Sequence, residues 1–165
     1  MNLTSFLSTY ALTILNFMEN SSCYVIGVSG LVAAGKTSLM KKIGELLDDS
    51  VMLFWDDYDH LVKLEFNDPV KWVQEGCVAN KWKTTQFAED LHSLKEGKQI
   101  KHPKTETIIS PAKYIFVEEP SGRTREVMAD LIDFLIYIDL PQEISLARTV
   151  DRELNRANEG KPLKK

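Results

Sequence analysis

Residues 23–37 have the sequence CYVIGVSGLVAAGKT, and this stretch decides the fold class. It opens with Cys23–Val28, a continuous apolar run rich in β-branched side chains, which predicts a strand buried on both faces. Residues 30–37 then match the pattern GxxxxGK(S/T), and a helix from about Lys36 to Leu47 is expected to follow. A strand, this loop and a helix in direct succession predict a phosphate-binding loop.

The loop contains the residue types that hold the phosphates of a nucleotide. Its glycines let backbone N–H groups converge on phosphate oxygens, and the helix that follows adds partial positive charge. Lys36 is expected to reach the β and γ phosphates, and the Thr37 hydroxyl can ligate Mg²⁺. The alternative is a glycine-containing turn that binds nothing. The expected nucleotide contacts are Gly30, Ala33, Ala34, Gly35, Lys36, Thr37 and Ser38.

The bound nucleotide is expected to be ATP. A guanine-specific switch protein would need the pattern NKxD and a DxxG turn. The segment Asn80–Lys83 lacks the closing Asp, and no Asp in the chain has Gly three positions later. An adenine nucleotide is therefore favoured, with Mg²⁺ as the cofactor that accompanies it.

Composition excludes several other classes of protein. The chain has 165 residues, 44% of them hydrophobic, which is enough for one domain with a sizeable core. Its net charge of −4 argues against a nucleic-acid partner. No apolar run approaches the roughly 20 residues that span a bilayer, which argues against membrane insertion. Cys23 and Cys77 form neither a disulfide framework nor a CxxC pair, which favours a cytoplasmic location, and a homo-oligomer stays open.

Residues 1–22 form a separate segment ahead of this domain. Their apolar side chains recur at helical spacing, which favours an amphipathic helix that packs on a neighbouring surface. A secretion signal is not expected, because the first Lys or Arg of the chain is Lys36. A disordered leader and a natural start at Met18 are the alternatives. The apolar positions are Leu3, Phe6, Leu7, Tyr10, Ala11, Ile14 and Phe17.

Three further apolar runs, 51–55, 114–117 and 134–138, predict buried strands. The polar middle of the chain, 60–112, is expected to be mostly helical, and Pro141 opens a last helix. Strands that alternate with helices predict an α/β protein with the three-layer P-loop NTPase fold, in which helices cover both faces of a mostly parallel sheet. The expected buried side of the last helix consists of Ile144, Ala147, Val150 and Leu154.

Two pairs of acids directly follow strand-like runs. Asp56, with Asp57 beside it, follows the run 51–55, and Glu118, with Glu119 beside it, follows the run 114–117. Ligands bind at the carboxyl ends of the strands in open α/β sheets, so these acids are expected to face the phosphate loop. We assign Glu118 to Mg²⁺, directly or through water, and Asp56 to the proton of an attacking hydroxyl. The choice within each pair stays open, and a solvated carboxylate or a helix cap is the alternative for either.

An arginine stripe is expected on the last helix. Arg148, Arg152 and Arg156 repeat every four residues and so share one side of the helix. Arginines that close over a phosphoryl group stabilise its charge during transfer. The stripe therefore predicts a mobile lid over about 142–160, with Arg148 and Arg152 as catalytic residues. The alternative is a solvated face neutralised by neighbouring acids.

Taken in order, these motifs resemble the uridine kinase and phosphoribulokinase family, whose close relatives include the nicotinamide riboside kinases. The match runs from residue 24 to about 158 and combines five stretches. They resemble the family's first strand with its phosphate loop, its Gln-Asp-x-Phe signature, its substrate loop, its strand ending in a Mg²⁺-linked Glu, and its arginine-bearing lid helix. In that order the stretches are 26–37, 55–58 (WDDY), 66–69 (FNDP), 116–118 (FVE) and 138–152.

The resemblance implies roles for residues beyond the phosphate loop. It makes Asp56 the catalytic base and puts Asp57 and Tyr58 beside the substrate. The Asp that holds ribose hydroxyls in the family aligns with Asn67, or with Asp68 if the loop shifts. Asp57, Tyr58, Asn67 and Asp68 are therefore the expected substrate-binding residues.

Three departures from the family pattern concern the acceptor and the adenine pocket. Glu119-Pro120 stands where Glu-Gly is usual, and the family's uracil-reading Tyr and His have no clear equivalents around His102. The chain also stops soon after the lid helix, without the family's final helix and strand. We therefore expect either a fragment or an open adenine pocket.

Together these observations predict a kinase domain over 23–165 with an acceptor segment over about 56–112. The expected reaction transfers the γ-phosphoryl of ATP to a hydroxyl of a small-molecule acceptor, and a nucleoside is favoured. The alternatives are a kinase for pantothenate or a sugar phosphate, which would differ only in the acceptor segment, and a non-catalytic ATP-binding regulatory module.

Overall fold

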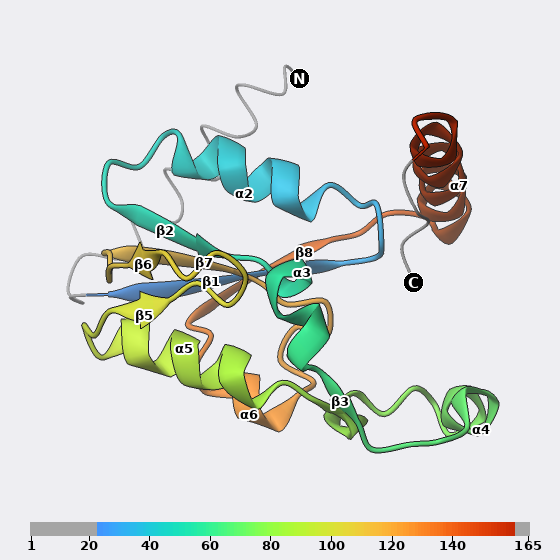
Figure 1. The fold of residues 1–165 in the computed structure, drawn as a ribbon, viewed down its shortest axis with the longest axis horizontal. Coiled ribbons are helices and arrows are strands. Elements are labelled where there is room, and N and C mark those ends of the chain that lie inside the picture. The colour runs from blue at the N-terminus through green and yellow to red at the C-terminus, as the bar shows by residue number, and fades with distance from the viewer. Residues whose placement is uncertain (1–22, 161–165) are drawn as a thin grey trace.

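A parallel four-stranded sheet forms the centre of the protein (Figure 1). The computed structural model describes residues 23–160. The strands lie in the order β2-β7-β1-β8, and every neighbouring pair is parallel. This arrangement confirms the predicted α/β fold with a parallel sheet. The strands are β1 (Tyr24–Gly30), β2 (Ser50–Leu53), β7 (Tyr114–Glu118) and β8 (Phe134–Ile138).

Helices cover both faces of this sheet. Figure 1 shows α2 (Lys36–Gly44) on one face, and α5 (Thr85–Lys95) with the short α6 (Glu126–Ala129) on the other. A parallel sheet needs cover on both sides, because its strands are apolar on both faces. The three layers therefore agree with the apolar runs in the sequence.

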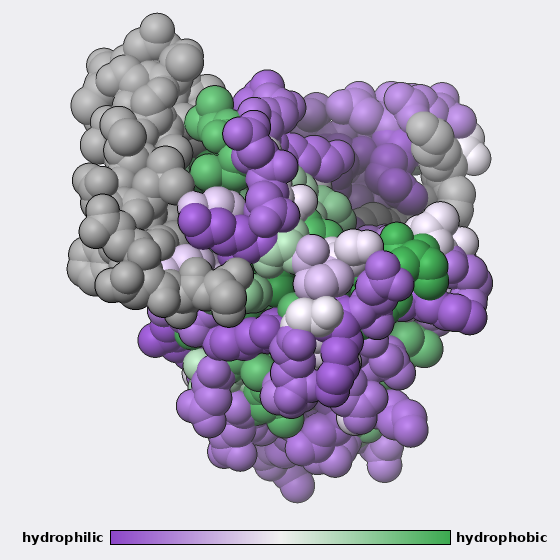
Figure 2. Space-filling model, turned by 90° about the vertical axis from the view of Figure 1, so that its left-hand side faces the viewer, coloured by the Kyte–Doolittle hydropathy of each residue, from purple (hydrophilic) through white to green (hydrophobic). Residues whose placement is uncertain are grey.

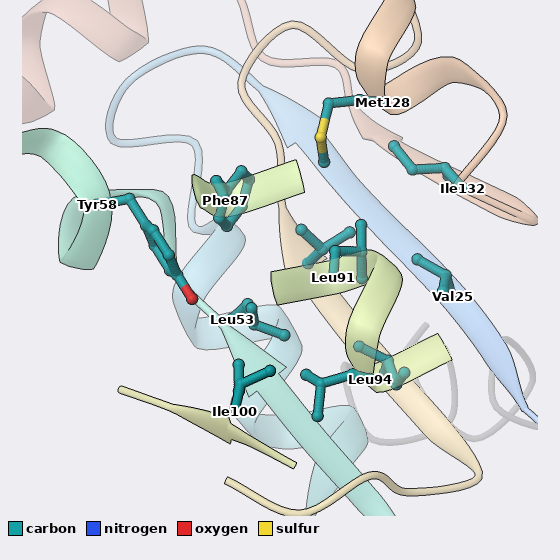
Figure 3. Close-up of a cluster of buried hydrophobic side chains, with 11 residues drawn as sticks. Val25, Leu53, Tyr58, Phe87, Leu91, Leu94, Ile100, Met128 and Ile132 are labelled. Atoms are coloured by element: carbon teal, nitrogen blue, oxygen red, sulfur yellow. The ribbon is translucent and has the colours of Figure 1, made fainter. Parts of the chain in front are cut away.

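Each face of the sheet has its own hydrophobic core, because alternate strand side chains point in opposite directions. Val25 belongs to the cluster that contains Phe87 and Leu91 of α5, which Figure 3 shows. Ile26, the next residue of β1, belongs to the cluster on the other face, with Met40 of α2. Full burial of a side chain of this size stabilises a fold by about 1.5–3 kcal/mol.

The elements around the phosphate loop agree with their predictions except at their ends. β1 extends two residues further than expected, to Gly30, and β8 occupies the predicted residues. α2 ends at Gly44 rather than near Leu47. The backbone N–H groups of Leu46 and Leu47 donate to carbonyls three residues back, so the last turn tightens beyond the α-helical pattern. Leu47 is nevertheless buried, as its spacing indicated.

The middle of the chain, predicted to be mostly helical, also contains two small antiparallel pairs of strands. β3 (Lys63–Leu64) pairs with β4 (Trp82–Lys83), and β5 (Ile100–Lys101) pairs with β6 (Ile108–Ile109). Strands of two residues are too short to show alternation, so no pattern in the sequence indicates them. The remaining elements of this segment are α3 (Trp55–Tyr58), η1 (Asp59–Leu61), α4 (Pro69–Gln74) and η2 (Ala79–Lys81).

The last helix, α7 (Gln142–Asn158), stands away from the sheet (Figure 1). The prediction for its buried side is wrong, because Ile144, Ala147, Val150 and Leu154 are all exposed. Ser145 is the one buried residue of the helix. Helical spacing of apolar residues shows that a helix is amphipathic, but it does not show that the apolar side is packed. α7 therefore adds little to either core.

Hydrophilic residues cover most of the described surface on the face drawn in Figure 2. Apolar residues on this face form separate small groups. Within residues 23–160 no helix has the length and apolar character needed to cross a membrane. The amphipathic helix expected within residues 1–22 lies outside the described residues.

Phe87 tests the packing of the core between the sheet and α5. Its ring is fully buried and lies 5.7 Å from the ring of Trp55 and 4.7 Å from that of Tyr58. Phe87→Ala should lower the free energy of unfolding by about 3–5 kcal/mol, measured by urea denaturation, because it removes contacts and leaves a cavity. Val127→Ala, at an exposed position of α6, is the control and should change it by less than about 0.5 kcal/mol. Equal effects of the two substitutions would contradict this packing.

Candidate active site

The phosphate loop joins β1 to α2 through backbone conformations that favour glycine. Gly30 and Gly35 have φ angles of +140° and +96°. A Cβ atom on Gly30 would lie 2.7 Å from the backbone oxygen of Ile138, so a larger residue does not fit there. Ala33 also adopts a left-handed conformation, with φ of 56°. The loop therefore turns tightly against the end of β8 before the first turn of α2.

Lys36 and Thr37 meet Glu118 at this loop. The Nζ atom of Lys36 donates to the carbonyls of Gly30 and Leu31, at 3.1 Å in each case, and lies 3.6 Å from Oε1 of Glu118. The Thr37 hydroxyl donates to Oε2 of the same carboxylate at 3.3 Å. The parallel register of β1 and β7 explains the contact, because it brings the carboxyl end of β7 beside the start of the loop. The sequence-predicted loop residues and the strand-end acid are thus in one place.

The surroundings of Glu118 suit a divalent cation. Burial raises the pKa of the Glu118 carboxyl, the nearby Lys36 lowers it, and the charge of Asp56 raises it. In the described part of the chain no group of three or more His, Cys, Asp and Glu side chains could hold a metal ion by itself. Mg²⁺ is commonly held by one or two carboxylates together with substrate phosphates, so a hydroxyl and a carboxylate beside a phosphate loop fit this ion.

A cleft of about 1020 Å³ extends from the phosphate loop to the acceptor segment. Asp56, Glu118 and Arg152 come from three separate sequence motifs, and all of them line it. The phosphate-loop residues on its wall are Gly30, Leu31, Val32, Ala33, Gly35, Lys36, Thr37 and Ser38. Ala34 is the one predicted loop contact that does not line the cleft, because its side chain is buried beneath the loop.

Three tryptophans also line the cleft, and only Trp55 belongs to one of the sequence motifs. Trp55, Trp72 and Trp82 all line the cleft, and they are the only tryptophans in the chain. The ring of Trp82 lies 5.7 Å from that of Trp72 and 6.4 Å from that of Trp55. Phe66 stacks on Trp72 at 5.0 Å, with only 5° between the ring planes. The concentration of all three tryptophans within residues 55–82 was the available signal for this aromatic wall.

Of the four residues expected beside the substrate, Asp57, Tyr58 and Asp68 have other partners, and none of the four lines the cleft. Asp57 pairs with His102, whose Nε2 lies 3.2 Å from Oδ2. Tyr58 is buried, and its hydroxyl donates to Asp90 at 2.8 Å.

The two substrate-loop residues, Asn67 and Asp68, are also absent from the lining of the cleft. Asp68 caps α4 and accepts from the backbone N–H groups of Val70 and Lys71, at 2.9 and 3.1 Å. Asn67 is exposed. The helix-cap alternative that applies to any lone acid is therefore realised at Asp68.

A buried ion pair lies behind the cleft, and sequence reasoning missed it. Arg125 is 1% exposed, and its Nε donates to Oε1 of Glu119 at 3.1 Å. The same guanidinium also donates to the hydroxyl of Thr84 and stacks over the ring of Trp55 at 4.6 Å. Burial raises the pKa of Glu119, and the hydrogen bonds from Arg125 oppose that rise. Thr84 occupies the N-cap position of α5, but its hydroxyl accepts from Arg125 and makes no cap hydrogen bond.

α7 touches the phosphate loop through its first turns. The Ser145 hydroxyl donates to the carbonyl of Val32 at 2.7 Å, and Arg148 donates to the carbonyl of Ala33 at 3.5 Å. Arg152 lines the cleft and forms an ion pair with Glu153 at 3.2 Å. Arg156 pairs with the same glutamate at 3.5 Å. Part of the arginine stripe is thus neutralised by one of the expected acids, while its first member faces the loop.

A buried strand, a phosphate loop and a helix, with acids at the ends of two neighbouring strands, define a nucleotide-binding protein of the phosphate-loop class. The model of the family described as "Phosphoribulokinase / Uridine kinase family" matches residues 25–161. The chain therefore belongs to this family and is a small-molecule kinase, which agrees with the resemblance of its motifs.

Individual relatives agree with this assignment. The chain is 32% identical over 145 residues to a uridine kinase of Borrelia duttonii, a match that covers 80% of this chain and 68% of that protein. It is 31% identical over 145 residues to a uridine kinase of Borrelia turicatae, with the same coverage. Its fold is similar to that of a possible uridine kinase from Bacillus stearothermophilus, with a TM-score of 0.62 and 19% identity over 90% of this chain and 87% of that one.

Lys36 tests the phosphate-binding role of the loop. Hydrogen bonds to charged groups contribute about 1.5–3 kcal/mol, so Lys36→Ala should weaken ATP binding by about 10- to 100-fold. Isothermal titration calorimetry with ATP and Mg²⁺ measures the change. Lys42→Ala is the matched control, because Lys42 is an exposed lysine of the same helix that pairs only with Glu45 in the described contacts. An unchanged affinity in Lys36→Ala would contradict a phosphate site at this loop.

Proposed function

We propose that this kinase transfers the γ-phosphoryl group of ATP to a hydroxyl of a nucleoside. The observation that carries the proposal is that one cleft joins a phosphate loop, a carboxylate and a wall of three tryptophans. Family membership supports ATP as the donor and a small metabolite as the acceptor. The tryptophans favour an acceptor with a planar heterocycle, because aromatic rings stack well on one another.

In this proposal the phosphate loop binds the triphosphate of ATP. Backbone N–H groups of the loop and of the first turn of α2 would bind the phosphate oxygens, and Lys36 would replace its bonds to Gly30 and Leu31 with bonds to the β and γ phosphates. Thr37 and Glu118 would hold Mg²⁺, which when bound neutralises charge on the phosphates. The distance of 3.3 Å between the Thr37 hydroxyl and Glu118 supports this pairing.

Asp56 is the proposed general base. It is exposed, it lines the cleft, and its charge acts on the carboxyl of Glu118 at the loop. As the acceptor hydroxyl oxygen bonds to the γ-phosphorus, the bond from that phosphorus to the β,γ-bridging oxygen breaks, and the hydroxyl proton moves to Asp56. Asp57, the open alternative, has its carboxylate engaged by His102, which favours Asp56.

The acceptor is proposed to bind between Asp56 and the tryptophans. Trp55 directly precedes Asp56. A nucleoside whose nucleobase stacks on the three tryptophans would therefore have its sugar hydroxyls toward the Asp56 carboxylate. This proposal differs from the expected substrate contacts at Asp57, Tyr58, Asn67 and Asp68, which have other partners or do not line the cleft.

The lid arginines are proposed to stabilise the charge of the phosphoryl group in transfer. Arg152 lines the cleft, and Arg148 contacts the loop through the Ala33 carbonyl. A guanidinium offers several donors in a fixed plane, which suits a group with three equatorial oxygens. Arg152 pairs with Glu153 in this structure, so the phosphoryl group in transfer would compete with Glu153 for the guanidinium.

A screen of acceptors for ADP release tests the proposed substrate class. Purified full chain is incubated with ATP, Mg²⁺ and single acceptors: the common nucleosides, pantothenate, nicotinamide riboside, and sugars with and without a phosphate. Acceptor-dependent ADP release with nucleosides and not with simple sugars would support the proposal. Turnover confined to pantothenate or to a sugar phosphate would overturn the nucleoside assignment while leaving the kinase reaction intact.

Asp56→Asn tests the proposed base with an acceptor from that screen. The substitution keeps the shape of the side chain and removes its basicity, so kcat should fall by about 10²-fold or more. The dissociation constant of ATP should stay within about twofold, because the loop is untouched. Asp130→Asn serves as the control, since Asp130 is exposed after α6 and does not line the cleft. A fully active Asp56→Asn enzyme would remove Asp56 from the mechanism.

A further inference from the structure

The loop between β5 and β6 reaches across to the turn that carries Asp56. His102 lies in this loop, and its Nε2 atom is 3.2 Å from Oδ2 of Asp57. Lys104 follows two residues later, and its Nζ donates to the backbone carbonyl of Asp56 and lies 3.2 Å from Oδ1 of Asp59. Two side chains from one loop thus contact three of the four residues 56–59, namely Asp56, Asp57 and Asp59.

The ring of His102 is held in one orientation by contacts at both of its nitrogens. Nδ1 accepts from the backbone N–H groups of Lys104 and Thr105, at 3.2 and 3.3 Å. A nitrogen that accepts hydrogen bonds carries no proton, so in the neutral ring the proton lies on Nε2, the nitrogen that lies 3.2 Å from Oδ2 of Asp57. The ring is half-buried, with 22% of its side chain exposed. His102 is therefore held with its Nε2 against the carboxylate of Asp57.

The turn that His102 contacts, α3, depends on tertiary contacts for its conformation. α3 has four residues, and an isolated single helical turn is unstable in water. Its core side is anchored by Trp55, which packs on Phe87, and by Tyr58, which donates to Asp90. These anchors lie at the first and last residues of α3. Asp57, between them, is anchored by His102.

We propose that His102 is a positioning residue for phosphoryl transfer, which acts through Asp57 to fix the turn that presents Asp56 to the cleft. Lys104 supports the same turn at the Asp56 carbonyl. The inference rests on one part of the proposed function, which is that Asp56 accepts the proton of the acceptor hydroxyl. Misplacement of a reacting group by about 1 Å can cost about 10²-fold in rate, so a lost anchor at the neighbouring residue should be visible in turnover.

Amide hydrogen exchange tests the anchor without any acceptor. In His102→Ala, exchange at residues 55–59 should become at least several-fold faster, while exchange in α2 stays unchanged. His92→Ala is the matched control, because His92 is an exposed histidine whose Nε2 lies 3.3 Å from a carboxylate oxygen of Glu96, away from the cleft. Unchanged exchange at 55–59 in His102→Ala would overturn the inference at its first step.

Turnover tests the consequence for catalysis, with ATP and the best nucleoside of the screen. His102→Ala should lower kcat by about 10-fold and leave the KM for ATP within about twofold, because the turn moves while the phosphate loop does not. His102→Gln should recover part of the loss, since its side-chain amide can still donate to Asp57. His92→Ala should match the parent. A purely structural role would instead lower the melting temperature with no separate loss of kcat.

A double substitution shows whether His102 acts through Asp57. Asp57→Ala and His102→Ala should each lower kcat, and the double variant should be no slower than the slower single variant, because both remove the same contact. Multiplied effects, or a normal kcat in His102→Ala despite faster exchange, would overturn the inference. An active Asp56→Asn enzyme would instead contradict the proposed base, and the exchange result at residues 55–59 would stand independently.

Discussion

The buried pair of Glu119 and Arg125 is the interaction on which the acceptor side of this protein depends. An uncompensated charge in a protein interior is costly, and breaking one partner of a buried pair typically costs about 3–5 kcal/mol. Arg125 must therefore stay against Glu119 at the end of β7, and from there it also holds Thr84 at the start of α5 and stacks on Trp55. One guanidinium thus joins the sheet, the acceptor segment and the aromatic wall.

The two halves of the candidate site are held by different kinds of contact. The phosphate loop takes its shape from glycines at positive φ, which a short stretch of sequence can specify, although its close approach to Ile138 is a long-range contact. The acceptor side is assembled from residues far apart in the chain, since Arg125 meets Thr84 across 41 positions and Lys104 meets Asp56 across 48.

This division explains what could be predicted from the sequence. The predicted strands 23–28 and 134–138 and the predicted start of the first helix at Lys36 follow from local patterns, and the structure has them at Tyr24–Gly30, Phe134–Ile138 and Lys36. The aromatic wall, the two-residue strands and the pair at Arg125 leave no periodic signal, because tertiary contacts decide them. The failure at α7 has another cause. Its spacing correctly indicates an amphipathic helix, but whether Val150 and Leu154 are buried depends on what lies opposite them, and both are exposed.

The same geometric rule separates the members of both acidic pairs. Successive residues at the end of a strand point to opposite sides, so Glu118 faces the Thr37 hydroxyl while Glu119 turns to Arg125. Successive residues of a helical turn are rotated by about 100°, so Asp56 lines the cleft while Asp57 turns to His102. In each pair one carboxylate faces the cleft, and the other is held by a basic partner that fixes the backbone between them. Replacing Glu119 or Asp57 would therefore be expected to displace the neighbouring acid that faces the cleft. The two acids of each pair thus have different roles.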